Sequence, residues 1–247
     1  MEIPDALGDP DLYAEARLDG DNAGQPVLRL FVVQRYLRAG RANEAQTYLP
    51  ANASDCGGYA SDWTETRLEI LRHLGRTAEL QTALWQEFCH SPSSERLQAC
   101  LAAAAPEKRS ALVERARAEV NDDRHDSVTR VRYYVAQHDL EEAARCVLRR
   151  RESFEGQRYE FLLPLAQVLA AVQPLAATVL YQALLETNLQ QALSKYCSHG
   201  VRYWRTLAEL AARIDDWRDL VPHATYTSTV RGWMRTWTGS REFLRAE

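Results

Sequence analysis

The chain has 247 residues, of which 46% are hydrophobic and 26% charged, and its formal net charge is −4. This composition is typical of a folded globular protein and excludes a disordered chain, and the length corresponds to one or two domains. The negative charge argues against a protein dominated by binding to nucleic acid or to an anionic membrane. No apolar run is long enough to predict a membrane-spanning helix, so we expect no membrane partner.

Arginine supplies all but two of the 30 basic residues, and alanine, leucine and arginine dominate the composition. All three favour helices, whereas the β-branched residues that favour strands are few. We therefore predict an all-α fold. We attribute the arginine excess to the codon preference of a bacterial genome and do not take it by itself as evidence of nucleic-acid binding.

Residues 1–26 are predicted to form a short, loop-rich acidic N-terminal arm, with acidic residues at seven positions and one arginine. Asp9 followed by Pro10 is a typical helix start, which predicts a short helix near residues 10–18 inside the arm.

After residue 26, helical spacing of apolar residues recurs in pairs. Gly40 separates predicted helices at 27–39 and 41–49, and Gly75 separates a helix capped by Asp62 from one at 76–89. The two glycines are 35 residues apart in similar sequence contexts. Further helices are expected at 93–104, 106–120, 127–137, 140–150, 159–171, 174–186, 201–214 and 223–237, with loops at 50–61 and 152–157 and no convincing strand.

A period of about 35–40 residues is typical of solenoids built from helix pairs, because one pair cannot bury its own apolar face. We therefore predict that residues 27–247 form a single α-helical repeat domain of helical hairpins, a TPR-like α-solenoid, with an interruption near 121–126. The tetratricopeptide consensus Trp-x-x-Leu-Gly-x-x-Tyr is absent, so the likeness is one of architecture. An irregular all-helical globule is the alternative.

The C-terminal half carries a recognisable set of short motifs. They are Leu-Ala-Ala-Val-Gln-Pro-Leu-Ala-Ala-Thr-Val-Leu at 169–180, Ser-Lys-Tyr at 194–196, Asp-Asp-Trp at 215–217 and His-Ala-Thr-Tyr-Thr-Ser-Thr-Val-Arg at 223–231. Together they resemble an uncharacterised bacterial all-helical family, a domain of unknown function often found C-terminal to SWIM-type zinc fingers. The resemblance implies a helical-repeat fold and no particular reaction. The chain departs from the family ending, His-x-Arg-Lys-x-x-Phe-Trp, at 233–244, and it lacks the SWIM cysteine and histidine set.

Motifs that carry known chemistry are missing from the sequence. There is no phosphate-binding glycine loop, zinc-protease helix or nucleophile elbow, so we predict a protein that is not an enzyme and needs no cofactor. Asp122, Asp123, His125 and Asp126 could supply hard metal ligands, but they lack the glycine and glutamate of a calcium loop. We expect a helix-capping loop there and no metal site.

The five cysteines have wide spacings and no C-x-x-C pair, and the N-terminus lacks a secretion-signal pattern. Most of these cysteines are expected to be buried free thiols in a reducing, cytoplasmic environment.

Tryptophan and arginine concentrate near the C-terminus, where four of the six tryptophans lie in the last 44 residues. Trp, Tyr and Arg dominate binding hot spots. The candidate binding residues are Tyr196, Arg202, His223, Tyr226, Arg231, Trp233 and Arg235. Two alternatives remain open: His223 and Tyr226 can be structural residues of one helix face, and the tryptophans can form the end cap of a solenoid.

We thus predict a non-enzymatic helical scaffold that binds a protein or peptide. The alternative is a nucleic-acid-associated protein that uses the C-terminal Arg/Trp-rich region, since arginines and aromatic rings suit single strands. An enzyme would need a polar pocket that joins His223 to an acidic residue. The sequence leaves monomer and homodimer open.

Overall fold

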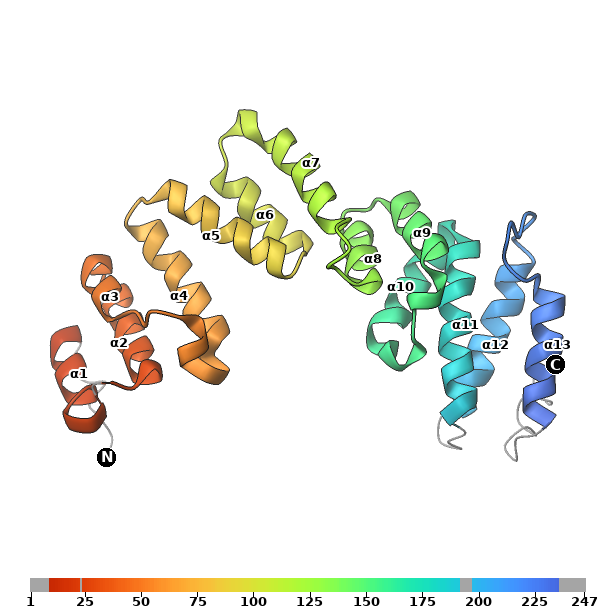
Figure 1. Ribbon diagram of the computed structural model, residues 1–247, viewed down its shortest axis with the longest axis horizontal. Helices are drawn as coiled ribbons and strands as arrows, with labels where there is room; N and C mark the ends of the chain where they lie inside the picture. The colour runs from red at the N-terminus through yellow and green to blue at the C-terminus, as the bar shows by residue number, and fades with distance from the viewer. Residues whose placement is uncertain (1–8, 23, 192–196, 236–247) are drawn as a thin grey trace. The chain divides into compact units, whose positions relative to one another are not determined.

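The computed structural model describes residues 9–22, 24–191 and 197–235, and it describes side chains as far as Gln190 before the second gap and over 199–232 after it. Within these residues the regular structure is helical throughout, with thirteen α-helices, short 3-10 turns and no strand (Figure 1). The all-α prediction is confirmed. The described part of the chain contains no helix long and apolar enough to cross a membrane.

The chain divides into two compact units, one made of residues 1–90 and 98–110 and the other of residues 91–97 and 111–247. The division passes through α6 (Ser94–Ala103) and the start of α7 (Arg109–Val120), which follows the short turn η4 (Pro106–Lys108). The polar segment 121–126 lies inside the second unit.

The first unit contains five further helices and two 3-10 segments. These are α1 (Pro10–Arg17), η2 (Gly20–Asn22), α2 (Pro26–Arg38), α3 (Ala42–Tyr48), η3 (Ala53–Tyr59), α4 (Ala60–His73) and α5 (Thr77–His90). A core of small and large apolar residues, among them Val32, Val33 and Ala45, joins α2 to its neighbours.

Helix α1 begins as the sequence predicts, because the Asp9 carboxylate accepts a hydrogen bond from the backbone N–H of Asp11 and Pro10 occupies the first turn. The helix packs on α2 through Ala14. The Tyr36 hydroxyl donates to the Asp11 carboxylate at 2.6 Å, and Arg41 bonds the other oxygen at 2.7 Å. This part of the acidic segment is therefore tied to the first helical pair.

Three helix pairs turn through the same backbone bonds. At Gly40, the N–H of Arg41 bonds the carbonyl of Tyr36 while that of Gly40 bonds Leu37. The same two bonds recur around Gly75 and around His138. Each pattern is a Schellman cap, which requires a positive φ at the turn residue, and the φ values are 73°, 64° and 58°.

Two local predictions in the first unit are wrong. Asp62 does not cap α4, because the helix begins at Ala60 with Tyr59 at its N-cap. The segment 50–61 is not simply a loop, because η3 runs from Ala53 directly into α4. The Trp63 indole N–H donates to the carbonyl of Pro50 at 2.8 Å, which fixes the entry to α4.

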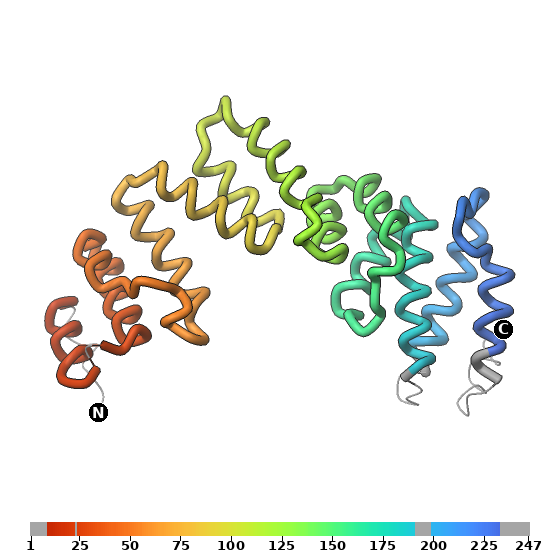
Figure 2. Tube along the Cα trace, viewed as in Figure 1, coloured from red at the N-terminus to blue at the C-terminus, as the bar shows by residue number. Residues whose placement is uncertain are grey.

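The second unit contains six further helices and two 3-10 turns. They are α8 (Ser127–Ala136), α9 (Leu140–Arg149), η5 (Arg151–Ser153), η6 (Gly156–Arg158), α10 (Tyr159–Val172), α11 (Pro174–Gln191), α12 (Cys197–Ala211) and α13 (His223–Arg235). Helix α8 pairs with α9, and α11 packs on both α10 and α12. Figure 2 shows α10, α11 and α12 side by side. Their interface is closed by fully buried side chains such as Leu162, Leu180 and Leu207.

Candidate binding surface

Helix α10 has apolar residues on two faces. One row is buried in the second unit and consists of Leu162, Leu165, Ala166 and Leu169. A second row faces solvent: Phe161 is 38% exposed, Val168 43% and Val172 55%. Because residues seven and eleven positions apart return to nearly the same side of a helix, the second row forms a stripe on one side of α10, in which the buried Leu165 separates Phe161 from Val168. We call these three residues the α10 face.

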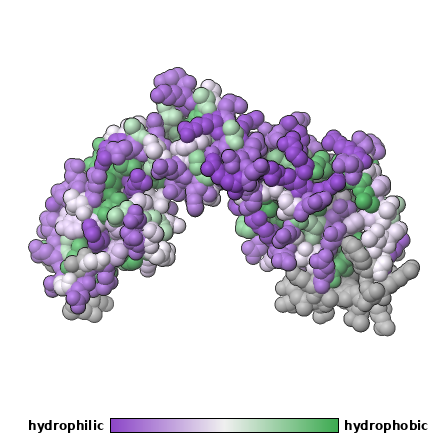
Figure 3. Space-filling view, in the orientation of Figure 1, coloured by the Kyte–Doolittle hydropathy of each residue, from purple (hydrophilic) through white to green (hydrophobic). Residues whose placement is uncertain are grey.

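The surroundings of the α10 face are polar, as is most of the surface visible in Figure 3. The guanidinium of Arg132 on α8 lies 4.9 Å from the centre of the Phe161 ring, and that of Arg158 on η6 lies 5.6 Å from it. Arg158 is also 3.4 Å from the Asp126 carboxylate. The Phe161 ring therefore has an exposed apolar surface and lies close to two arginine guanidiniums, an arrangement that cation–π attraction stabilises.

A cavity of about 260 Å³ opens between the start of α6, α8 and α10. Arg132, Tyr133 and Leu165 contribute to its wall, opposite the segment 91–95. The Ser93 hydroxyl accepts from the backbone N–H of Arg96, and Ser94 accepts from Gln137 at 2.8 Å. Since Leu165 neighbours the stripe on the α10 helix, the cavity adds a recess of mixed polarity beside the α10 face.

A second cavity, of about 280 Å³, lies between η6, α10, α11 and α12. Its lining residues are Gly156, Gln157, Tyr159, Leu163, Leu184, Thr187, Asn188, His199 and Tyr203. Gly156 is needed there, because a Cβ atom at this position would lie 2.2 Å from the carbonyl oxygen of Ala183. The predicted binding residue Arg202 is exposed beside this cavity. Its guanidinium lies 3.2 Å from Nδ1 of His199 and 5.8 Å from the centre of the Tyr203 ring.

His223 and Tyr226 lie on the first turns of α13. Tyr226 is buried, and this burial, together with the Glu186 carboxyl of α11, raises the pKa of its hydroxyl far above the ordinary value. Burial also raises the pKa of Glu186 and lowers that of His223. The His223 ring lies 6.3 Å from the buried ring of Trp204, and its Nδ1 is buried without a hydrogen-bond partner. The two residues therefore pack where α13 meets α11 and α12.

The other predicted binding residues are only partly described. Arg231 is exposed on α13. Tyr196 lies outside the described residues, and of Trp233 and Arg235 only the helical backbone is described. The described contacts of Arg202 and of His223 involve different neighbours, His199 and Tyr203 for the former and Trp204 for the latter.

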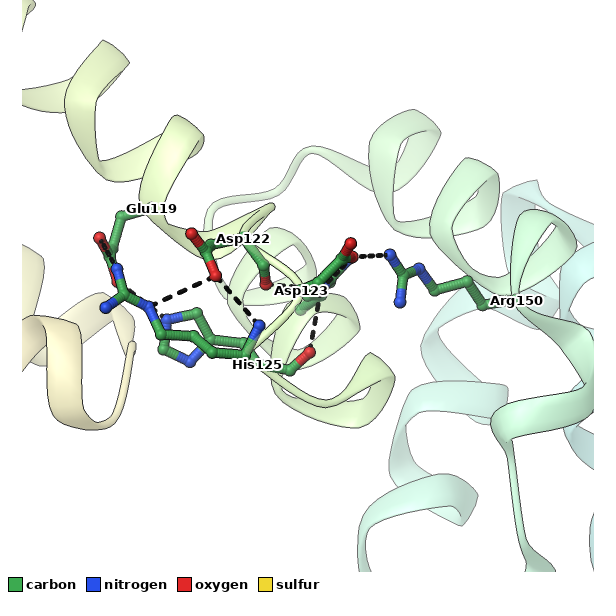
Figure 4. A network of polar contacts seen from close by, with 7 residues as sticks. Glu119, Asp122, Asp123, His125 and Arg150 are labelled. Atoms are coloured by element: carbon green, nitrogen blue, oxygen red, sulfur yellow. Dashed lines mark hydrogen bonds and ion pairs between the residues drawn. The ribbon is translucent and has the colours of Figure 1, made fainter.

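The acidic segment after α7 forms a network of ion pairs and helix caps (Figure 4). The His125 ring and the Arg124 guanidinium both contact the Glu119 carboxylate, at 3.0 and 2.6 Å. Asp126 accepts from the backbone N–H of Thr129 at 2.8 Å and so caps α8, as the capping interpretation predicts. Asp123 contacts Arg150, which lowers the pKa of its carboxyl.

Metal-binding geometry is absent from the part of the chain that the structure describes, where no group of three or more His, Cys, Asp or Glu side chains is placed to hold an ion.

The composition of α10 contains a signal for the α10 face. Among the 14 residues of this helix, Glu160 and Gln167 alone carry a charge or an amide. Outside a membrane, a helix that is apolar nearly all round is normally buried in a core, so apolar residues left exposed on it indicate a further contact. The predicted binding residues lie near the C-terminus instead, because tryptophan and arginine concentrate there.

Together these features define an all-helical protein whose second unit carries an arginine-bordered apolar helix face. The chain belongs to a family of unknown function, DUF6880, whose model matches residues 1–236. This confirms the resemblance to an uncharacterised family and extends it beyond the C-terminal half, while the link to SWIM-type zinc fingers stays a prediction. No curated protein and no solved structure matched the chain.

Proposed function

We propose that the protein is a non-enzymatic helical-repeat scaffold of the bacterial cytoplasm and that it binds a protein or peptide partner along the α10 face. The observation that carries this proposal is the row Phe161, Val168 and Val172, which is exposed beside a buried row on the same helix. Contiguous exposed apolar residues with a polar rim are typical of interaction sites.

The local repetition of structure supports the scaffold. The same Schellman cap recurs at Gly40, Gly75 and His138, and in the second unit α8 packs on α10 while α9 packs on α11. Packing of this kind between neighbouring pairs supports a TPR-like solenoid, whose stacked repeats offer one extended binding surface. On this proposal α8 and α10 are the first helices of successive pairs, and the α10 face belongs to that surface.

Affinity capture from a native bacterial lysate, with and without nuclease, tests the proposal. The full chain is compared with the double variant Val168→Glu/Val172→Glu, and Gln167→Glu provides a matched control because Gln167 is an exposed polar residue of the same helix. We expect a partner protein that survives nuclease treatment, binds the control and is lost with the double variant. A partner that binds the double variant equally well contradicts the site.

The C-terminal residues provide the competing site in the same experiment. Loss of the partner with Trp233→Ala/Arg235→Ala, and not with Val168→Glu/Val172→Glu, places binding at the predicted C-terminal set. If nuclease treatment removes the captured protein from every sample, the result favours the nucleic-acid alternative. In that case the affinity for nucleic acid falls steeply with salt concentration.

A further inference from the structure

Arginine dominates the exposed charges around the α10 face. On η6, α8, α10 and α12, the exposed charged residues comprise four arginines and two glutamates. They are Arg132, Arg158, Arg202 and Arg205 against Glu160 and Glu209. A further exposed arginine, Arg213, follows α12 and is close in sequence to the exposed Asp215 and Asp216. This local excess of positive charge contrasts with the net charge of −4 of the whole chain.

Two of these arginines, together with Arg213, are held next to the apolar row by described contacts. The guanidiniums of Arg132 and Arg158 lie 4.9 and 5.6 Å from the centre of the Phe161 ring. At the other end of α10, Arg213 donates to the carbonyl oxygens of Ala170 and Ala171, each at 2.7 Å. Carbonyl oxygens do not cancel the guanidinium charge, so both ends of the row are bordered by positive charge.

The described carboxylate partners of Arg132 and Arg158 offset only part of this charge. Asp126 lies 3.4 Å from Arg158. Hydrogen bonds from the backbone and from Ser93, and to a lesser degree the charge of Arg132, lower the pKa of the Glu95 carboxyl. A guanidinium has five N–H donors, so an arginine that stacks on a ring keeps donors for a further carboxylate.

Building on the proposed function, we propose that the occupant of the α10 face is an acidic amphipathic segment of a partner protein. Its apolar side chains pack on Phe161, Val168 and Val172, and its flanking aspartates or glutamates pair with Arg132 and Arg213. The row from Phe161 to Val172 is about 16 Å long at 1.5 Å per residue, a length that about three turns of a partner helix match. Grooves that bind amphipathic helices recognise such i, i+3 or i+4 and i+7 anchors.

Selection from a random peptide display library on the immobilised full chain tests this partner chemistry. We expect the enriched peptides to carry net negative charge and apolar residues at helical spacing. For a synthetic enriched peptide, Arg132→Glu weakens binding about tenfold at low salt and less at high salt. The matched control is Arg145→Glu, which reverses an exposed arginine on α9 and leaves the affinity unchanged. A peptide with lysine in place of its acidic residues regains affinity for Arg132→Glu.

The outcomes separate this inference from the proposal on which it rests. Enriched peptides that are basic or uncharged, yet lose binding to Val168→Glu/Val172→Glu, overturn the acidic partner and leave the α10 face as the site. Peptides that bind this double variant with the same affinity as the wild type contradict the α10 face as the binding site. A library that yields no enriched peptide counts against both.

Discussion

Single residues determine how the helix pairs turn, and the three Schellman caps differ in one chemical respect. Gly40 and Gly75 adopt positive φ without a Cβ, whereas His138 adopts φ of 58° with a full side chain. A left-handed conformation costs an L-residue about 1–2 kcal/mol. Glycine avoids this cost, but it loses more conformational entropy on folding, so the net stabilisation is smaller. We therefore predict that His138→Gly raises the free energy of unfolding by about 0.5–1 kcal/mol.

The reverse substitutions provide the control for this prediction. A Cβ at Gly40 or Gly75 meets no atom within 4 Å, so alanine there adds the conformational cost alone, about 1 kcal/mol at each position. Urea unfolding of the three variants measures all three values. A destabilised His138→Gly variant, or a large difference between Gly40→Ala and Gly75→Ala, contradicts the common cap.

His223 makes stability depend on pH. Burial lowers its folded-state pKa below the ordinary value of 6.5, and its place at the start of α13 also disfavours a positive charge. As the pH falls through 6.5, the unfolded chain takes up the proton before the native chain does, so the free energy of unfolding decreases. Above this value both states are neutral and the effect vanishes.

The variant His223→Gln removes this titration. We predict that the wild type loses more stability than the variant between about pH 7.5 and about pH 5.5. Urea unfolding at both pH values gives the difference. Equal losses in the two proteins show that His223 titrates alike in the folded and unfolded states.

At the scale of elements, a buried arginine holds the connection between α7 and α8. The Arg130 guanidinium donates to the carbonyl oxygens of Asp122 and His125, at 2.6 and 3.0 Å. Arg130→Leu leaves these carbonyls without their donor, which we expect to lower the free energy of unfolding by about 2–4 kcal/mol. Arg130→Lys keeps the charge but not the forked set of donors, so its free energy of unfolding is expected to lie between those of the wild type and Arg130→Leu. Thermal unfolding of both variants tests the order.

The elements also show what the sequence could predict. Helix pairs around Gly40 and Gly75 follow from apolar spacing and from the conformational freedom of glycine, and Asp9 with Pro10 marks a start that needs only local bonds. The predicted cap at Asp62 failed because a preceding 3-10 segment extends into α4. Local side-chain preference could not reveal this, since the Trp63 bond to Pro50 fixes the helix entry through a contact 13 residues away.

The candidate site was less predictable than the fold for a related reason. Tyr226 was recognised as part of one helix face, but the Glu186 carboxyl beside it comes from another helix. The apolar row on α10 was present in the sequence, yet which row is buried depends on the helices packed against it. Periodicity within one helix does not contain that information.

At the scale of the whole molecule, the proposed repeat architecture predicts how a local defect spreads. Contacts in a solenoid join neighbouring pairs, so destabilisation of one part leaves distant pairs folded, whereas a globule with a single core unfolds as one. Leu30 is fully buried in the first unit, and Leu30→Ala should cost about 2–5 kcal/mol.

Native-state hydrogen exchange of Leu30→Ala tests whether the loss of one core side chain stays local, as the repeat architecture and the division into two units both predict. We predict that the amides of α2 and α4 exchange faster while those of α10 and α11 keep the wild-type rates. The matched variant Leu180→Ala, fully buried in the second unit, should give the opposite pattern. A uniform acceleration over all described helices in either variant contradicts the repeat architecture and favours the irregular globule, because only a shared core transmits the loss of one side chain to every element.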